Sequence, residues 1–255
     1  LYLVEVSPGL RGEQERRLAT AAPVWLDEIG DLPAGPLLLV ANEFLDALPI
    51  RQLVRGPAGW SERMVALDAA GALVFADLPA GPAAALLAAQ RGRGGEQPGD
   101  VVEICPAALA LAAALGNRLA HQPGAALFID YGHTGGRRGG SLRAVRRHRP
   151  VPVLSCPGTA DLSAYVDFAA VAEAGRRAGA EIRGSASQAR FLNSLGAQVR
   201  LAALSAGASP AQRSTLEEGL ERLLDPEGMG GFEVMAMVSP GLPVPADLAV
   251  LRATP

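Results

Sequence analysis

The sequence predicts an α/β fold built on a doubly wound, mostly parallel sheet. Residues 37–41 and 125–130 are almost entirely apolar, as strands buried on both faces are. Segments with helical patterns alternate with the strands, and this order places helices on both faces of one sheet. We therefore expect 37–41 and 125–130 to be parallel neighbours in the core.

Composition limits the classes of protein that this chain can represent. It has 255 residues, 49% of them hydrophobic, which is enough for a sizeable core and excludes general disorder. No stretch approaches 18 consecutive apolar residues, so we expect no membrane span. Two cysteines, Cys105 and Cys156, are too few for a disulfide scaffold or a cysteine-built zinc site, and we expect no metal.

The charged residues exclude further classes. The formal net charge of −3 argues against a general nucleic-acid-binding surface. All 23 basic residues are arginine, which excludes a Schiff-base lysine, a lysine general base and a Walker lysine. The motifs G-x-S-x-G, H-E-x-x-H and C-x-x-C are absent, which weakens hydrolase and zinc-enzyme interpretations.

The first half of the chain contains a region of a different character. Three short strands between residues 50 and 77, separated by turns, predict an antiparallel β-hairpin excursion. The other elements expected there are strands at 1–6 and 24–29, a helix over 10–20, a helical turn at 42–48, a weak helix after residue 80 and a mobile loop at 91–99. A strand at 101–104 is expected to return the chain to the alternating core.

The second half continues the alternation of strands and helices. Pro106 and Asp167 are expected to begin helices, Asp167 as an N-cap, and Ser209 with Pro210 marks a third start. Residues 150–167 look loop-like, and 232–238 form the last strand. We expect one domain over residues 1–240 and a peripheral, proline-rich tail over 241–255.

Polar residues that end strands are the first candidates for a site, because ligands of doubly wound sheets bind beyond the carboxyl ends of the strands. Glu5 ends the first strand and could accept hydrogen bonds from a ribose, or it could simply be solvated. Asn42, Glu43 and Asp46 follow the strand 37–41. In a helical turn Glu43 and Asp46 would share one face and could hold a guanidinium or another cation. Alternatively, Asp46 caps a turn and Asn42 satisfies loop backbone.

Further candidates lie near the second apolar strand. Asp130 and Tyr131 end it, and Asp161 and Asp167 flank Tyr165 in DLSAYVDF. All four candidates could contribute to a substrate pocket. Glycines and arginines at 132–141 are similar in composition to a phosphate-cradling loop, a weak indication of a nucleotide-binding enzyme. The arginines of 137–149 indicate a solvated or partner-facing surface without aromatic residues for base stacking.

Eight blocks occur in a characteristic order: VEVSPGLR at 4–11, NEFLDALPIRQ at 42–52, GWSERMV at 59–65, VVEICP at 101–106, FIDYGH at 128–133, PGTADLSAYVDF at 157–168, QARFLNSLG at 188–196 and MGGFEVMAM at 229–237. As a set they resemble the MidA-type family of S-adenosylmethionine-dependent methyltransferases. That family includes a mitochondrial arginine methyltransferase that assists assembly of respiratory complex I. The resemblance covers nearly the whole chain.

The resemblance implies a class I methyltransferase fold, a Rossmann-like sheet with an antiparallel last strand. It makes 1–6 the second core strand, 37–41 the fourth, 125–130 the fifth and 232–238 the last. The family's first strand and glycine-rich cofactor loop would lie upstream of residue 1, so we expect an N-terminally incomplete chain.

The resemblance also assigns roles. Glu5 and Asn42 would bind S-adenosylmethionine. Asn42, Glu43 and Asp46 would form the floor of the methyl-transfer site, with Glu43 as the main catalytic carboxylate. The implied substrate is a protein arginine. The implied location is the cytoplasm in a bacterium or the mitochondrial matrix in a eukaryote. A non-catalytic assembly factor that keeps the fold for binding a partner is the alternative.

Overall fold

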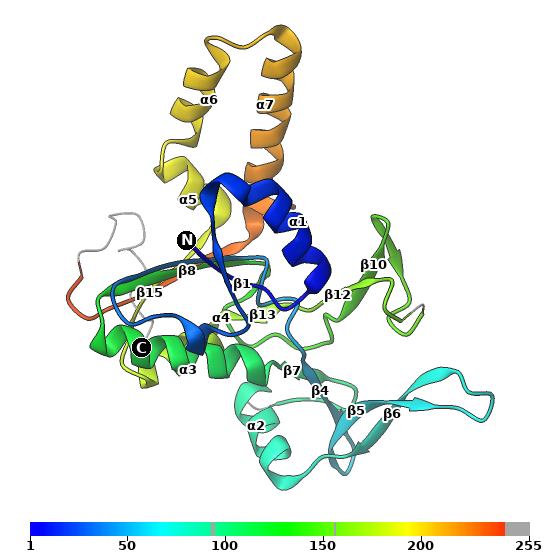
Figure 1. Cartoon of the computed structure of the whole chain (residues 1–255). Coiled ribbons are helices and arrows are strands. Elements are labelled where there is room, and N and C mark those ends of the chain that lie inside the picture. Colours follow the sequence, from blue (N-terminus) through cyan, green and yellow to red (C-terminus); the bar gives the residue numbers. More distant parts are fainter. Residues whose placement is uncertain (93–94, 156, 243–255) are drawn as a thin grey trace.

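The central sheet has four strands in the order β14-β15-β8-β3 (Figure 1). The structure is a computed structural model and describes residues 1–92, 95–155 and 157–242. β3 (Leu37–Asn42) is parallel to β8 (Gly124–Asp130), and β15 (Glu233–Val238) runs antiparallel between β8 and β14 (Glu181–Ser187). The parallel pairing of 37–41 with 125–130 and the antiparallel last strand are thereby confirmed.

A second sheet carries the predicted hairpin excursion. β4 (Arg51–Gly56), β5 (Gly59–Leu67) and β6 (Leu73–Pro79) form the antiparallel meander. β7 (Val101–Ile104), expected to return the chain to the alternating core, instead pairs antiparallel with β4. The reason is apolar burial, because side chains of β7 pack with those of β4 and α2 (Pro82–Gly92) in a separate core.

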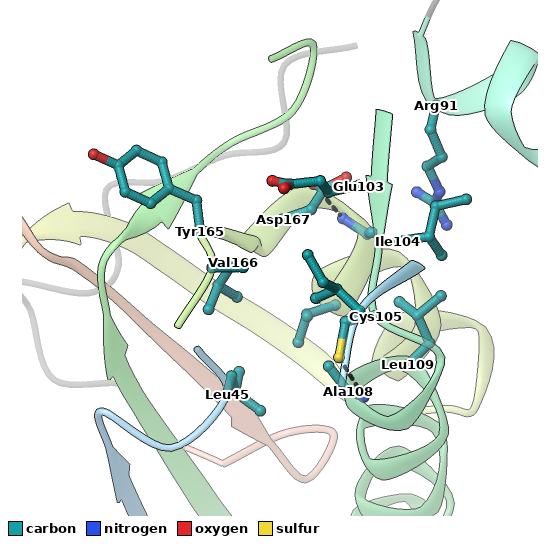
Figure 2. Close-up of a pocket in the computed structure, with 14 residues that line it drawn as sticks. Leu45, Arg91, Glu103, Ile104, Cys105, Ala108, Leu109, Tyr165, Val166 and Asp167 are labelled. Atoms are coloured by element: carbon teal, nitrogen blue, oxygen red, sulfur yellow. Dashed lines mark hydrogen bonds between the residues drawn. The ribbon is translucent and has the colours of Figure 1, made fainter. Parts of the chain in front are cut away.

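Short strands connect the second sheet to the site region. They are β9 (Gly132–His133), β10 (Arg143–Arg146), β11 (Arg149–Val151), β12 (Asp161–Ser163) and β13 (Val166–Asp167). The expectation that 150–167 is loop-like holds for residues 152–155 and 157–160. It was wrong for the flanking residues, since β13 pairs with β9 and both β11 and β12 pair with β10. A small pocket lies where β7, β13 and two helix starts meet, lined by Cys105 and Asp167 among others (Figure 2).

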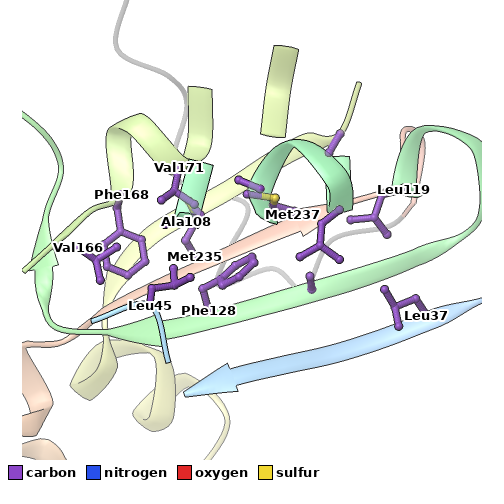
Figure 3. Close-up of a cluster of buried hydrophobic side chains, with 14 residues drawn as sticks. Leu37, Leu45, Ala108, Leu119, Phe128, Val166, Phe168, Val171, Met235 and Met237 are labelled. Atoms are coloured by element: carbon purple, nitrogen blue, oxygen red, sulfur yellow. The ribbon is translucent and has the colours of Figure 1, made fainter. Parts of the chain in front are cut away.

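Helices cover both faces of the central sheet, as doubly wound folds require. α3 (Pro106–His121) and α4 (Phe168–Arg177) pack on one face, where Phe128, Met235 and Met237 point toward them (Figure 3). α5 (Gln188–Ser194) packs on the other face. The helix starts at Pro106 and the N-cap at Asp167 are confirmed.

The N-terminal strands stand apart from this sheet. β1 (Tyr2–Val4) and β2 (Val24–Leu26) form a separate parallel pair, with α1 (Pro8–Leu18) between them in sequence. The resemblance placed residues 1–6 in the core sheet itself. In the described part of the chain, neither β1 nor β3 has a partner on its second edge. Leu38 and Val40 of β3 are 90% and 70% exposed.

The remaining elements are helical. α6 (Ala197–Ser205) and α7 (Pro210–Leu224) form a hairpin that projects from the body (Figure 1), and Ser209 caps α7 as predicted. Short 3₁₀ turns occur at Ala19–Ala21, Ile29–Asp31 and Met229–Gly231. Among the described helices, none combines the length and apolar character needed to cross a bilayer. The expected tail lies, from residue 243, outside the described residues, as do residues 93–94 of the expected loop.

Candidate active site at the ends of β3 and β8

The parallel pairing of β3 and β8 brings two predicted groups of side chains together. Asn42 ends β3 opposite Ile129, and the amide of Glu43 still donates to the carbonyl of Ile129 at 2.9 Å. Asp130 and Tyr131 follow directly on β8. The carboxyl ends of these strands are where a doubly wound sheet binds its ligands, so these residues form the candidate site.

Asp130 shapes the loop after β3. Its Oδ2 accepts hydrogen bonds from the backbone amides of Phe44, Leu45 and Asp46 at 3.0–3.2 Å. Its Oδ1 accepts one from the amide of Tyr131 at 2.9 Å. The residue is 1% exposed. Asp130 was expected to contact a substrate, but a carboxylate enclosed by backbone donors is suited to positioning the loop instead.

Burial also changes the acidity of Asp130. Loss of solvation, and then the charge of Asp46, raise the pKa of Asp130 from 3.8 to about 7, although the backbone donors oppose the shift. The carboxyl group is therefore near its titration point at neutral pH. Its protonation weakens the hydrogen bonds that hold residues 44–46 but removes the larger cost of a buried charge, so the folded state favours the protonated form.

The segment 42–48 is not the helical turn that was predicted. Glu43 has a φ of +47° in the left-handed region, and the next three amides turn toward Asp130. These amides bond a side chain from another strand, so no helical face forms here. Consequently Glu43 is exposed while Asp46 is 8% exposed, and the two carboxylates do not stack one helical turn apart.

Asp46 is the most unusual polar group of the site. Its Oδ2 accepts a hydrogen bond from the hydroxyl of Tyr131. Its Oδ1 is buried and has no hydrogen-bond partner among the residues that the structure describes. The predicted alternative, that this side chain caps a turn, does not match these bonds. A buried carboxylate oxygen without a donor is costly unless a ligand supplies one.

Aromatic rings and arginines flank this carboxylate. Tyr131 and Tyr165 meet edge to face at 5.9 Å between ring centroids. The guanidinium of Arg143 lies 4.5 Å from the ring centroid of Tyr131, and that of Arg137 lies 4.5 Å from the ring of Tyr165. Burial and the bond to Asp46 raise the pKa of Tyr131. The hydroxyl thus stays protonated and donates to Asp46.

Glu5 lies at the carboxyl end of β1, as expected. Its Oε1 accepts from the amide of Ser7 at 2.8 Å. Arg11 donates to the carbonyls of Glu5 and Leu26 and so joins the ends of β1 and β2. The half-buried carboxylate of Glu5 keeps acceptor capacity for hydroxyl groups. Asn42 is exposed, and its amide lies 3.5 Å from Glu43 Oε1.

The other two candidates lie elsewhere. Asp161 is exposed on β12, at the register position opposite Val145. Asp167 accepts from the amide of Ala170 at 3.0 Å as the N-cap of α4, and it lines the pocket of Figure 2. Neither makes a described contact with Asp46 or Tyr131, so the structure does not join them to the carboxylate site.

Glu103, a strand-ending carboxylate that the sequence singles out without assigning it a role, supports the site. It accepts hydrogen bonds from the side chain of Gln52 at 2.8 Å and from the amides of Ser141 and Leu142. The hydroxyl of Ser141 in turn accepts from the amide of Tyr165 at 2.8 Å. The sequence signal was a glutamate inside the otherwise apolar VVEI.

The glycine-rich loop does not form a phosphate cradle. The amide of Gly139 donates to the carbonyl of Val101 at 3.0 Å, and Arg138 donates to the carbonyl of Gly95 at 3.0 Å. The element that follows is β10, whereas a phosphate loop leads into a helix N-terminus. The loop thus connects the site region to β7 of the second sheet through the hydrogen bond from Gly139 to Val101.

A doubly wound sheet with an antiparallel last strand and a carboxylate site at the ends of its parallel strands is the architecture of a class I methyltransferase. The profile of a family of S-adenosyl-L-methionine-dependent methyltransferases matches residues 1–186. The chain belongs to this family.

Relatives and solved structures agree with this assignment. Protein arginine methyltransferase NDUFAF7 of Xenopus tropicalis is 35% identical over 90% of this chain, and the mouse protein is 36% identical over 81%. This chain spans 58% and 46% of their lengths. A crystal structure of a Burkholderia thailandensis protein bound to S-adenosyl-homocysteine is similar with a TM-score of 0.83 and 34% identity, covering 98% of this chain and 66% of that one.

Proposed function

We propose that the protein containing this chain transfers a methyl group from S-adenosylmethionine to an arginine side chain of a protein. The observation that carries the proposal is the buried Oδ1 of Asp46, which lacks a donor. A guanidinium is a cation with several N–H donors in a fixed plane. The names of the mitochondrial relatives support arginine as the acceptor.

Glu5 and Asn42 are the residues that would hold the cofactor. Glu5 presents a carboxylate at the end of β1, where ribose hydroxyls could donate to it. Asn42 presents an exposed amide at the end of β3. Bound S-adenosylmethionine supplies an activated methyl group, so the protein has mainly to align the acceptor nitrogen.

Asp46 and Tyr131 would orient the acceptor. The hydroxyl of Tyr131 occupies Oδ2 of Asp46, which leaves Oδ1 to receive one N–H of the substrate. The guanidinium groups of Arg137 and Arg143 lie over the rings of Tyr165 and Tyr131, which supports a site suited to planar cations.

Glu43 would take the proton that the acceptor nitrogen loses. Arginine is protonated at neutral pH and is a poor nucleophile, so a carboxylate that localises its charge away from the attacking nitrogen assists transfer. Glu43 is exposed and could pass the proton to water. Asp46 would be engaged by the hydroxyl of Tyr131 and by the acceptor guanidinium, which gives the two carboxylates different tasks.

The resemblance supports two finer proposals. One is a link to assembly of respiratory complex I. The other is a cytoplasmic location in a bacterium, whereas the eukaryotic relatives are named mitochondrial.

Glu43→Gln in the full-length protein tests the proton-acceptor role. We expect cofactor affinity to change little and methyl transfer to fall by about two orders of magnitude, the scale of losing one positioned charged group. Calorimetry would give the affinity, and transfer of a labelled methyl group would give the rate. Near-normal transfer would remove Glu43 from the mechanism.

A further inference from the structure

The hairpin of β10 and β11 carries a dense group of arginines that the proposed chemistry does not use. Arg146 pairs with Arg149, and residues 147 and 148 form the two-residue turn between them. Both turn residues have positive φ, +50° for Arg147 and +61° for His148. Glycine or asparagine is the usual choice at such positions. A basic tip is therefore present where local backbone preference favours other residues.

The tip is exposed and strongly charged. Residues 146–149 are all exposed, in a chain whose net charge is −3. The side chains of Arg146, Arg147 and Arg149 line an open hollow together with Val151. Within the described ranges, neither Arg147 nor Arg149 forms an ion pair. The hairpin thus offers guanidinium groups to an external anion.

The base of the same hairpin reaches the candidate active site. Arg143, the first residue of β10, places its guanidinium 4.5 Å from the ring centroid of Tyr131 and donates from Nε to Ser163 at 3.2 Å. Tyr131 holds Asp46. One strand therefore runs from the carboxylate site to the arginine tip. A strand rises about 3.3 Å per residue, so Arg146 lies roughly 10 Å along the strand from Arg143, and the turn with Arg147 begins one residue further on.

We infer that this arginine hairpin is a docking arm for an acidic segment of the protein substrate. The inference rests on the proposed function. The target arginine of such a peptide would meet the carboxylates of Glu43 and Asp46. Acidic residues of the same peptide would meet the arginines at the tip of the hairpin. An extended peptide spans about 3.3–3.6 Å per residue, so the acidic residues lie about four positions from the target arginine.

Charge and composition favour a peptide over a nucleic acid. Asp46, which Tyr131 connects to Arg143 at the base of the arm, would repel a phosphate backbone, whereas it attracts the target arginine. Residues 143–149 contain no Phe, Tyr or Trp on which bases could stack.

Two fluorescein-labelled 13-residue peptides test the inference on the full-length protein by fluorescence anisotropy. Both have one central arginine; one has glutamate pairs centred four residues away on each side, and the other has glutamines there. We expect the glutamate peptide to bind at least fivefold more tightly at 50 mM salt, with the difference largely lost at 300 mM. Equal binding of the two peptides at 50 mM would overturn the inference.

Matched variants locate the interaction. The triple variant R146Q/R147Q/R149Q should bind the glutamate peptide only as tightly as the glutamine peptide. The control R200Q/R213Q/R222Q makes the same charge change at exposed positions of α6 and α7 and should retain the preference. Equal loss in both variants would assign the effect to net charge and contradict a docking arm. If the triple variant fails to fold, R147Q alone should reduce the preference at least twofold.

The same assay separates the other outcomes. A fluorescein-labelled 12-nucleotide single-stranded RNA that binds more tightly than the glutamate peptide, and loses binding in the hairpin variant, would overturn the peptide assignment. Because the assay needs no cofactor, its result is independent of catalysis. If the wild type transfers methyl groups to protein but binds the two peptides equally, the docking arm is contradicted and the proposed function is not. No transfer by the wild type contradicts the proposed function.

Discussion

Tyr131 and Asp46 are separated by 85 positions in the sequence, yet the hydroxyl of Tyr131 donates a hydrogen bond to Oδ2 of Asp46. The adjacent Asp130 gathers the amides of residues 44–46 and so fixes the backbone from which Asp46 projects. Asp130, the last residue of β8, and Tyr131, which follows it, together set the position of the Asp46 carboxylate. The free Oδ1 of Asp46 is the consequence on which the proposed function depends.

Tyr131→Phe should reduce kcat/KM for methyl transfer about tenfold to a hundredfold. A hydrogen bond to a charged group contributes about 1.5–3 kcal/mol, and without it Asp46 can turn away from the acceptor. Cofactor affinity should be unchanged by calorimetry. Tyr165→Phe is the matched control, because in the described residues its hydroxyl makes no hydrogen bond. Equal kinetics in the two variants would contradict a positioning role for Tyr131.

Asp130 should make stability depend on pH. Its pKa is about 7 in the folded protein and near 3.8 when unfolded, so the folded state binds the proton more tightly between these values. The contribution of Asp130 is then most favourable below pH 4 and is lost as pH rises to about 7, by at most about 1.4 kcal/mol per pH unit.

Thermal melts of wild type and Asp130→Asn from pH 4 to 8 would measure this dependence. We expect the wild type to lose stability relative to Asp130→Asn as the pH rises to about 7. Above that pH the difference should stay constant. A difference that stays constant across this range would show that Asp130 is not perturbed by burial.

The central sheet could be predicted from the sequence because the patterns that indicate its strands and helix starts lie in residues close together along the chain. The apolar runs at 37–41 and 125–130 can be stable only when buried on both faces, and the helix caps at Asp167 and Ser209 are formed by neighbouring residues. β7 was misplaced in the core because a strand's apolar pattern does not say which sheet buries it.

The gathering of polar residues at the ends of β3 and β8 was predicted, but their arrangement was not. Glu43 and Asp46 were identified from their place after a buried strand. Their true arrangement depends on Asp130, a residue distant in sequence that competes for the amides of a helical turn. The orphan oxygen of Asp46, the support from Glu103 and the approach of Arg143 to Tyr131 arise from such long-range contacts, which spacing along the chain does not encode.

Glu5→Gln should weaken S-adenosylmethionine binding by about 1–3 kcal/mol, the range for a lost charged hydrogen bond. The measurement is calorimetric titration of the full-length protein. Glu15→Gln, an exposed position on α1, should leave the affinity unchanged. If both substitutions had the same effect, Glu5 would have no specific part in binding the cofactor.

Residues 1–255 on their own should self-associate. Leu38 and Val40 are exposed on β3, and the second edge of this strand has no partner within the described residues; open apolar edges invite pairing. Leu38→Thr with Val40→Thr should lower the associated fraction in size-exclusion chromatography by severalfold. Leu195→Thr with Val199→Thr, exposed near α6, is the control. An exclusively monomeric chain would contradict this expectation.

Transfer of a labelled methyl group from S-adenosylmethionine to protein, followed by amino-acid analysis of the product, tests the central claim most directly. For the full-length wild type we expect label in methylarginine, and for Asp46→Asn we expect a loss of at least a hundredfold, the scale for a positioned charged group. Label in another residue type, or undiminished methylarginine in Asp46→Asn, would contradict the assignment of Asp46 as the group that receives the substrate guanidinium.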